Sequence, residues 1–192
     1  MSATPFVVGL DLSLTSTGVA LIAHDLSVRT VLEKSKGTRA DTITARRARL
    51  RDLADRVLAR CTGATLAAIE APAYSQAAGA GSHDRSGLWW LVVDGLVSAG
   101  VPVIQISPSS RPTYATGKGN SGKDAVIIAV TRRYWGVEIA DNNEADALVL
   151  GAMGARLLGR PIEGSLPQTH LRAMDKLTLP PGLVPLAAAA AA

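Results

Sequence analysis

Hydrophobic positions along this chain follow two periods, and their order predicts the arrangement of strands and helices. Short apolar runs that contain β-branched residues predict strands, whereas apolar residues three or four positions apart predict helices. The predicted strands are residues 6–11, 19–24, 29–34, 66–70 and 101–106. The predicted helices are residues 41–60, 85–99, 124–135 and 144–158. This order indicates an α/β fold with a five-stranded mixed sheet.

The same pattern suggests one domain with a tail. Residues 1–160 are expected to form a single domain, because no linker or internal repeat interrupts them. Residues 161–192 are expected to form a partly irregular C-terminal extension, since they contain several prolines and end in a run of alanines. Two loops rich in small or polar residues, 73–84 and 109–123, are expected to be flexible.

Composition narrows the class of protein without identifying an activity. The chain has 192 residues, 47% hydrophobic and 19% charged, which is enough to bury a core. Its net charge of +4 is compatible with a polyanionic partner but follows equally well from composition alone. Cys61, the sole cysteine, excludes an intramolecular disulfide and a thiolate metal site, and is expected to be buried and inert. With no leader and no membrane span, we expect a cytoplasmic protein.

Three acidic residues stand out because of their place in the predicted elements. Asp11 and Glu70 each end an apolar strand, and Asp146 lies in the first turns of the last helix. If the first and fourth strands are parallel neighbours, their carboxyl ends meet at one edge of the sheet. Clustered carboxylates repel one another unless a cation such as Mg²⁺ or Mn²⁺ neutralises them, and two such ions can catalyse phosphodiester cleavage. The plainer alternative is that Asp11 caps a turn and Asp146 is a surface charge.

Four motifs, taken together and in this order, resemble those of the RuvC-type Holliday junction resolvases of the RNase H-like nuclease superfamily. They are residues 9–18 (GLDLSLTSTG), 69–70 (IE), 116–123 (TGKGNSGK) and 144–148 (EADAL). The resemblance spans residues 6–158 and is greatest to divergent phage or actinobacterial members. It implies an RNase H-like fold with helices on both faces of the sheet. It also implies a bacterial or phage-encoded crossover junction endodeoxyribonuclease, a homodimer that uses Mg²⁺ to cut two strands of a four-way DNA junction.

The resemblance further implies the roles of the acidic residues. Asp11 would bridge two Mg²⁺ ions, for which Mn²⁺ can substitute, with Glu70 and Asp146 on either side. The family's fourth ligand lies three residues before the helix aspartate, where this chain has Asn143. Because an amide oxygen is neutral, one ion would bind more loosely there.

Two acidic neighbours of Asn143 leave an alternative open. Asp141 and Glu144 are near enough in sequence to replace Asn143 as a metal ligand. They also fit a structural role, in which Asp141 is the helix N-cap and Glu144 reaches back from the third helical position.

The glycine-rich segment before residue 124 resembles the family's DNA-contacting segment. Its glycines let the backbone approach phosphates closely, and its lysines supply positive charge. Lys123 matches the family's lysine better than Lys118 does. In the family, the loop after the Glu70 strand probes the junction centre, although an ordinary loop fits equally well here. The expected DNA-binding residues are Gly117, Lys118, Gly119, Lys123, Arg111, Tyr74 and Gln76.

Two further interpretations concern a histidine and a tryptophan pair. His83 is either a general base or an ordinary polar loop residue. The helix over residues 85–99 resembles the family's dimerisation helix. Because Trp89 and Trp90 lie about 100° apart on a helix, one is expected to pack inward and the other against a partner subunit.

Three other functions remain open at this stage. The first is a less selective nuclease that acts on flaps, forks or RNA–DNA hybrids. The second is a junction-binding protein without catalysis, a hypothesis that stays open because Asn143 stands at the position of the family's fourth metal ligand. The third is an ATPase of the sugar-kinase and actin type, but such proteins need two domains and this chain is too short for them.

Overall fold

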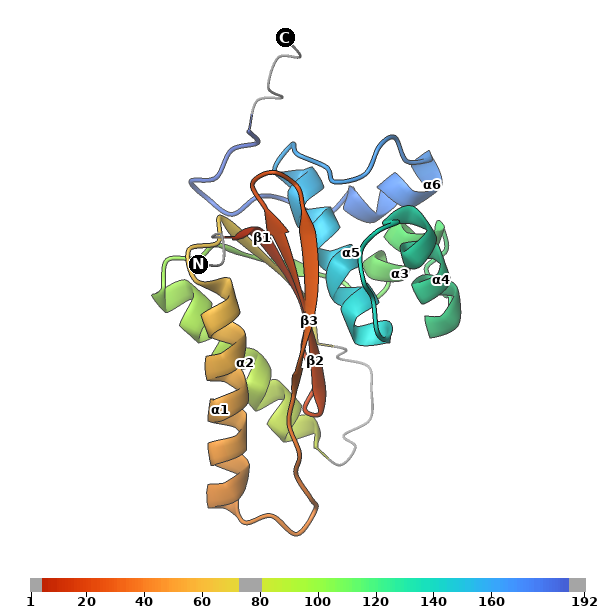
Figure 1. Ribbon diagram of the computed structural model, residues 1–192. Coiled ribbons are helices and arrows are strands. Elements are labelled where there is room, and N and C mark those ends of the chain that lie inside the picture. The colour runs from red at the N-terminus through yellow and green to blue at the C-terminus, as the bar shows by residue number, and fades with distance from the viewer. Residues whose placement is uncertain (1–4, 73–80, 187–192) are drawn as a thin grey trace.

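The computed structural model describes residues 5–72 and 81–186, which form a sheet between two layers of helices (Figure 1). The strands are β1 (Pro5–Asp11), β2 (Ser16–Ala23), β3 (Val28–Lys34), β4 (Leu66–Glu70) and β5 (Val103–Ile106). Their order across the sheet is β3-β2-β1-β4-β5. β2 is antiparallel to β1 and β3, whereas β4 is parallel to β1 and β5. The prediction of a five-stranded mixed sheet is therefore confirmed.

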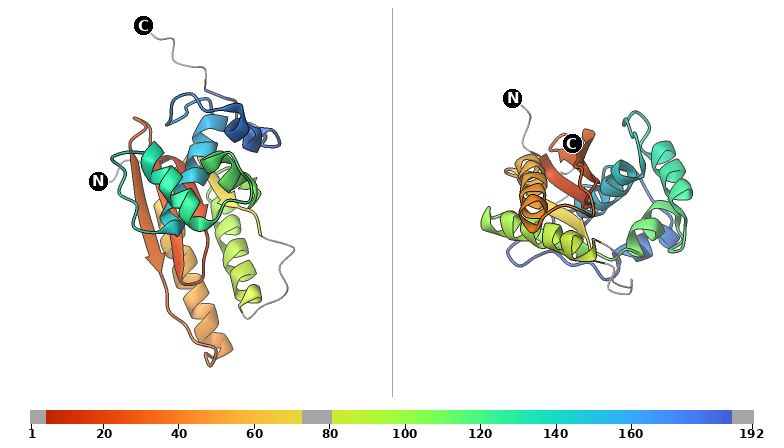
Figure 2. Two further views of the ribbon diagram at one scale, coloured as in Figure 1. Left: turned by 90° about the vertical axis from the view of Figure 1, so that its right-hand side faces the viewer. Right: turned by 90° about the horizontal axis from the view of Figure 1, so that it is seen from below.

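Helices cover both faces of this sheet, as expected. α1 (Ile43–Cys61) and α2 (Ser82–Ser98) cover one face (Figures 1 and 2). α3 (Ser110–Thr116), α4 (Lys123–Arg133) and α5 (Asn142–Leu157) lie on the other face. The C-terminal segment adds one short helix, α6 (Gln168–Leu171), and a 3₁₀ turn (Arg172–Met174).

The periods in the sequence explain these two layers. Successive side chains of a strand point to opposite faces, so Val7 of β1 packs in the α5 layer while Val8 packs against α1 and α2. On α1, the buried residues Leu53 and Val57 are four positions apart and share one side of the helix. Thr42 starts this helix, because its hydroxyl accepts a hydrogen bond of 3.2 Å from the Ala45 N–H.

The prediction of a flexible loop over residues 109–123 is wrong for residues 110–116. The chain there forms α3, and four successive residues of this helix, Pro112 to Ala115, are buried. Pro112 occupies the third helical position. Proline is tolerated in the first turn, because N–H groups there have no partner within the helix.

Cys61 is buried, as predicted, and burial raises the pKa of its thiol to about 12. The thiol is therefore protonated at neutral pH and is a poor nucleophile. Among the helices of residues 5–72 and 81–186, none combines the length and the apolar character that a membrane span needs.

α5 packs directly against the backbone of the sheet at two glycines. A Cβ atom at Gly9 of β1 would lie 2.0 Å from the carbonyl oxygen of Ala147 and 2.4 Å from the amide nitrogen of Gly151. A Cβ atom at Gly18 of β2 would lie 2.0 Å from the carbonyl oxygen of Asn143. No side chain fits at either distance, so only glycine allows α5 to approach this closely.

Replacing Gly9 by alanine is expected to lower the free energy of unfolding by about 3 kcal/mol or more, because the methyl group has no space between β1 and α5. Gly87→Ala in α2 is the matched control. A Cβ there would meet Leu50 Cδ1 at an ordinary 3.6 Å, and alanine favours the helix. Urea unfolding followed by circular dichroism measures both changes. A Gly9 variant as stable as the wild type would contradict this close packing.

Candidate active site

Asp11 and Glu70 end neighbouring strands at the same edge and on the same face of the sheet. β1 and β4 are parallel, with Gly9 opposite Ala68, so the two strands end side by side. Gly9 faces α5 and Ala68 packs in the same layer. Alternate residues of a strand share a face, so Asp11 and Glu70, each two positions further on, point to the α5 side.

Asp146 reaches this edge from the N-terminal turns of α5. Asn143 lies against Gly18 at the beginning of α5, and Gly154 lies against Val7 near its end, so α5 runs antiparallel to β1. Its first turns are therefore at the carboxyl end of β1. The Asp146 side chain is 7% exposed. The structure thus brings the three carboxylates predicted from the sequence to one edge of the sheet.

The surroundings make Asp11 and Glu70 costly to ionise. Burial, followed by the negative charge of Glu70, raises the pKa of Asp11 to about 6. Burial is also the largest cause that raises the pKa of Glu70. The positive charges of Arg111 and Lys123 lower both pKa values but do not cancel the rise. Additional positive charge at this edge would favour the ionised carboxylates.

Arg111, near the start of α3, lies between two of the carboxylates. Its Nε atom is 2.9 Å from Glu70 Oε1, and its Nη1 atom contacts Asp146 Oδ2. The Glu70 contact is an ion pair that lacks hydrogen-bond alignment. As the side chains lie, no three acidic, histidine or cysteine side chains of the described residues could hold a metal ion together. Arg111, predicted to contact phosphate, thus also offsets part of the negative charge of this site.

Two hydrogen bonds that involve backbone groups hold the end of β4 in place. The indole Nε1–H of Trp89 donates a hydrogen bond of 3.0 Å to the Glu70 carbonyl oxygen. The Ala71 N–H donates one of 2.8 Å to the carbonyl oxygen of Ile106 on β5. Trp89 therefore connects α2 to the residue that carries one of the carboxylates. Sequence analysis missed this role, because nothing near Trp89 in the sequence indicates a partner nineteen positions earlier.

The beginning of α5 has the predicted cap. Asp141 Oδ1 accepts hydrogen bonds from the backbone N–H groups of Asn143 and Glu144, at 2.9 and 3.0 Å. Glu144 reaches back as expected, but its Oε2 accepts from the Ala140 N–H, one residue before the cap. The Asn143 side chain donates a hydrogen bond of 3.2 Å to Asp141 Oδ2. The amide of Asn143 is therefore engaged with the cap, and its role as a metal ligand stays a prediction.

The glycine-rich segment leads from α3 to α4 as an ordered turn. Gly117 has a positive φ of 79° and ends α3. The Thr116 hydroxyl bonds to Ser121 Oγ at 2.7 Å and accepts from the Lys118 N–H at 3.2 Å. Lys123 begins α4, and its positive charge lowers the pKa of Asp11. Lys118 lies in the turn before α4 and is exposed to solvent.

The remaining predicted residues form no hydrogen bond or ion pair with the three carboxylates in the structure described, or lie outside the described residues. His83 lies exposed in the first turn of α2. Trp90, also on α2, is 64% exposed. Tyr74 and Gln76 fall outside the described residues, so their role at the junction centre stays a prediction. Gly119 is exposed in the turn before α4.

Comparison with known proteins places the fold. Scans against protein-family models and against curated proteins give no match. The chain is similar to the structure of Thermus thermophilus RuvC, with a TM-score of 0.62 and 21% identity over 80% of this chain and 96% of that one. It is also similar to T. thermophilus RuvC in complex with Holliday junction substrate, with a TM-score of 0.59 and 23% identity over 76% and 89% of the two chains. At these identities the likeness concerns the fold, and it confirms that this chain has the RNase H-like fold of RuvC.

Proposed function

We propose that this protein is a metal-dependent endonuclease that resolves Holliday junctions or other branched DNA by hydrolysis of phosphodiester bonds. The observation that carries the proposal is the meeting of Asp11, Glu70 and Asp146 at one edge of an RNase H-like sheet. Such a cluster is costly to bury, and a protein retains it where it has a use for concentrated negative charge. One of the two similar structures contains a Holliday junction substrate, which supports branched DNA as the substrate here.

The donor chemistry of this edge fits a divalent cation such as Mg²⁺. Asp11, Glu70 and Asp146 would hold it, since all three offer the hard oxygen atoms that Mg²⁺ prefers. When bound, Mg²⁺ would activate a water molecule and stabilise the charge that develops on the scissile phosphate. The two ion pairs of Arg111 must break before Glu70 and Asp146 can turn to such an ion. Arg111 and Lys123 would then be free to neutralise the DNA backbone beside the carboxylates.

The substitutions Asp11→Asn and Asp146→Asn are each expected to reduce cleavage of a synthetic four-way junction by about 100-fold or more, because each removes a charged metal ligand. Junction binding should persist, since neither change removes a positive charge. Asp55→Asn on α1, where the side chain is 61% exposed, is the matched control. Gel analysis of labelled junctions in Mg²⁺ measures the rates, and forks, flaps, linear duplex and RNA–DNA hybrid show whether the nuclease is selective. Wild-type rates in either variant would overturn the proposed site.

A junction-binding protein without cleavage is the second candidate, and the ion pairs of Arg111 favour it. A guanidinium that contacts both Glu70 and Asp146 competes with any metal ion for the same oxygen atoms. Binding of the junction without cleavage in either Mg²⁺ or Mn²⁺ would decide for this candidate. Cleavage by the wild type would decide against it.

Arg111→Gln tests this competition directly. Without metal, the variant should melt at a lower temperature than the wild type, because Glu70 and Asp146 lose their cation. It should bind Mn²⁺ about tenfold more tightly, since no ion pair has to break first. Calorimetric titration with Mn²⁺ and melting with and without the ion provide the measurements. Arg51→Gln on α1 is the control, and weaker Mn²⁺ binding by the Arg111 variant would show that this arginine does not compete with metal.

We further propose that two chains pair through α2, as a nuclease that cuts two strands requires. Trp90 and Val97 are each 64% exposed and lie seven positions apart, which is two turns on one side of the helix. Trp90 also packs edge-on against Trp89, with ring centroids 4.8 Å apart. A partner on this side would therefore contact the residue that holds the Glu70 carbonyl oxygen.

Trp90→Ser is expected to shift the protein from dimer to monomer, because it removes the largest exposed apolar side chain of α2. Light scattering after size-exclusion chromatography measures the mass across a range of concentrations. Trp135→Ser, at a residue 92% exposed after α4, is the control and should leave the mass unchanged. A monomeric wild type, or a Trp90 variant as dimeric as the wild type, would exclude this interface.

A further inference from the structure

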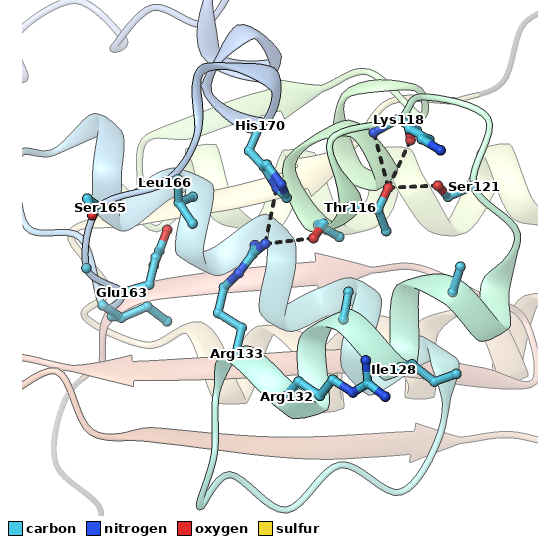
Figure 3. A pocket seen from close by; sticks show the side chains of 15 residues that line it. Thr116, Lys118, Ser121, Ile128, Arg132, Arg133, Glu163, Ser165, Leu166 and His170 are labelled. Atoms are coloured by element: carbon cyan, nitrogen blue, oxygen red, sulfur yellow. Dashed lines mark hydrogen bonds between the residues drawn. The ribbon is translucent and has the colours of Figure 1, made fainter.

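A groove lies between α4 and the C-terminal segment, on the α5 side of the sheet (Figure 3). The groove has a volume of about 1090 Å³ and is open to solvent. One wall is the side of α4 that carries Ala125, Ile128 and Arg132, which recur every three or four residues. Ser165 and Leu166 of the C-terminal segment form the opposite wall.

Polar contacts hold the C-terminal wall firmly against the domain. Nη2 of Arg133 donates a hydrogen bond of 2.7 Å to the Ala115 carbonyl oxygen and lies 3.1 Å from His170 Nδ1 (Figure 3). Nη2 of Arg172 donates one of 2.8 Å to the carbonyl oxygen of Gly117. Because both arginines bond to the end of α3, the groove has walls on both sides before any ligand arrives.

The acidic residue of the groove is already neutralised. Glu163 is buried, and its Oε1 atom lies 3.1 Å from Nη2 of Arg156 on α5. The Tyr114 hydroxyl also donates to this oxygen atom, and Nε of Arg156 bonds to the Tyr114 hydroxyl at 2.8 Å. Glu163 therefore fastens the C-terminal segment and leaves little negative charge to repel an anion.

The positive charges of the groove lack such partners. Lys118 and Arg132 are exposed, and within residues 5–72 and 81–186 neither forms an ion pair with an acidic side chain. Arg133 bonds to carbonyl oxygens and a histidine, so no carboxylate neutralises it either. The α4 wall is partly apolar, with Ile128 51% exposed. Unpaired cations that border a groove suit a ligand that carries phosphates.

The helix that forms one wall of the groove also borders the candidate active site at its first residue. Lys123, whose charge acts on Asp11, and Arg132 are on the same helix, nine positions apart. At 1.5 Å per residue this separation is about 14 Å, the axial rise of about four nucleotides in one strand. Nine positions also turn the helix by about 900°, so the two side chains lie on opposite sides of α4, and the groove would receive an arm other than the strand held at Lys123.

We propose that this groove binds the phosphate backbone of one arm of the branched DNA, between Lys118 and Arg132 on one side and the C-terminal segment on the other. This assignment rests on the proposed function, and it gives the C-terminal segment a part in substrate binding. Arg132 and Ser165 were not among the DNA-binding residues expected from the sequence. A free nucleotide or inorganic phosphate shares part of this chemistry and is an outcome that the test separates.

The test measures junction affinity by fluorescence anisotropy across a salt series, with Asp11→Asn in every protein so that the DNA stays intact. Arg132→Ala should weaken binding about fivefold and reduce the slope of log Kd against log salt by about 1, since one phosphate contact is lost. Arg132→Glu should weaken binding further, and Ser165→Glu should do the same from the opposite wall. Arg47→Glu, at an exposed arginine of α1 on the other face of the sheet, is the control and should bind as the parent does.

Arm length provides a second criterion. Junctions whose arms are too short to enter the groove should bind the parent and the Arg132→Glu protein equally. Unchanged affinity in Arg132→Glu and Ser165→Glu, or an equal loss in Arg47→Glu, would overturn the groove assignment. Displacement of the junction by ATP or inorganic phosphate at concentrations similar to that of the DNA would overturn it in favour of a small anion. These outcomes concern the groove alone. If the proposed function itself is wrong, the wild-type protein will fail to cleave the junction in the separate cleavage assay.

Discussion

The contact between α5 and the backbone of β1 at Gly9 is the constraint on which the candidate active site depends. With no side chain at this position, the carbonyl oxygen of Ala147 lies only 2.0 Å from where a Cβ atom would be. The same contact fixes both the depth and the direction of α5, and so brings Asp146 to the end of β1. A methyl group two residues before Asp11 would push the helix away and separate the carboxylates. The position of the charges thus follows from backbone packing.

Once the carboxylates lie together, their neutralisation becomes the next physical problem. Burial and mutual repulsion raise the pKa of Asp11 and disfavour its charge. Arg111 offsets part of this negative charge through its ion pairs with Glu70 and Asp146. It can reach both carboxylates because α3 starts close to the carboxyl ends of the strands. The short helix that interrupts an expected loop is therefore part of the site. Its first turn places the Arg111 guanidinium against Glu70 and Asp146.

The C-terminal segment is joined to this arrangement by polar contacts with the far end of the same helix. Arg172 and His170 contact the end of α3 or the arginine that bonds to it, and Glu163 contacts Tyr114. α3 therefore carries Arg111 at its beginning and supports one wall of a cationic groove at its end. The division into a domain over residues 1–160 and an extension over 161–192 stays a prediction, but the extension packs on the helices that border the carboxylates.

The sequence by itself determined the five strands, the long helices and the three carboxylates, because each has a local signature. Short apolar runs end in Asp11 and Glu70, and Asp141 caps the helix that carries Asp146. The tertiary structure alone decided that Arg111 lies between Glu70 and Asp146, that Trp89 holds the Glu70 carbonyl oxygen, and that α4 faces residues 162–170 across a groove. Contacts between residues far apart in the chain leave no period or spacing in the sequence. They arise only when packing, here the approach that Gly9 permits, brings those segments together.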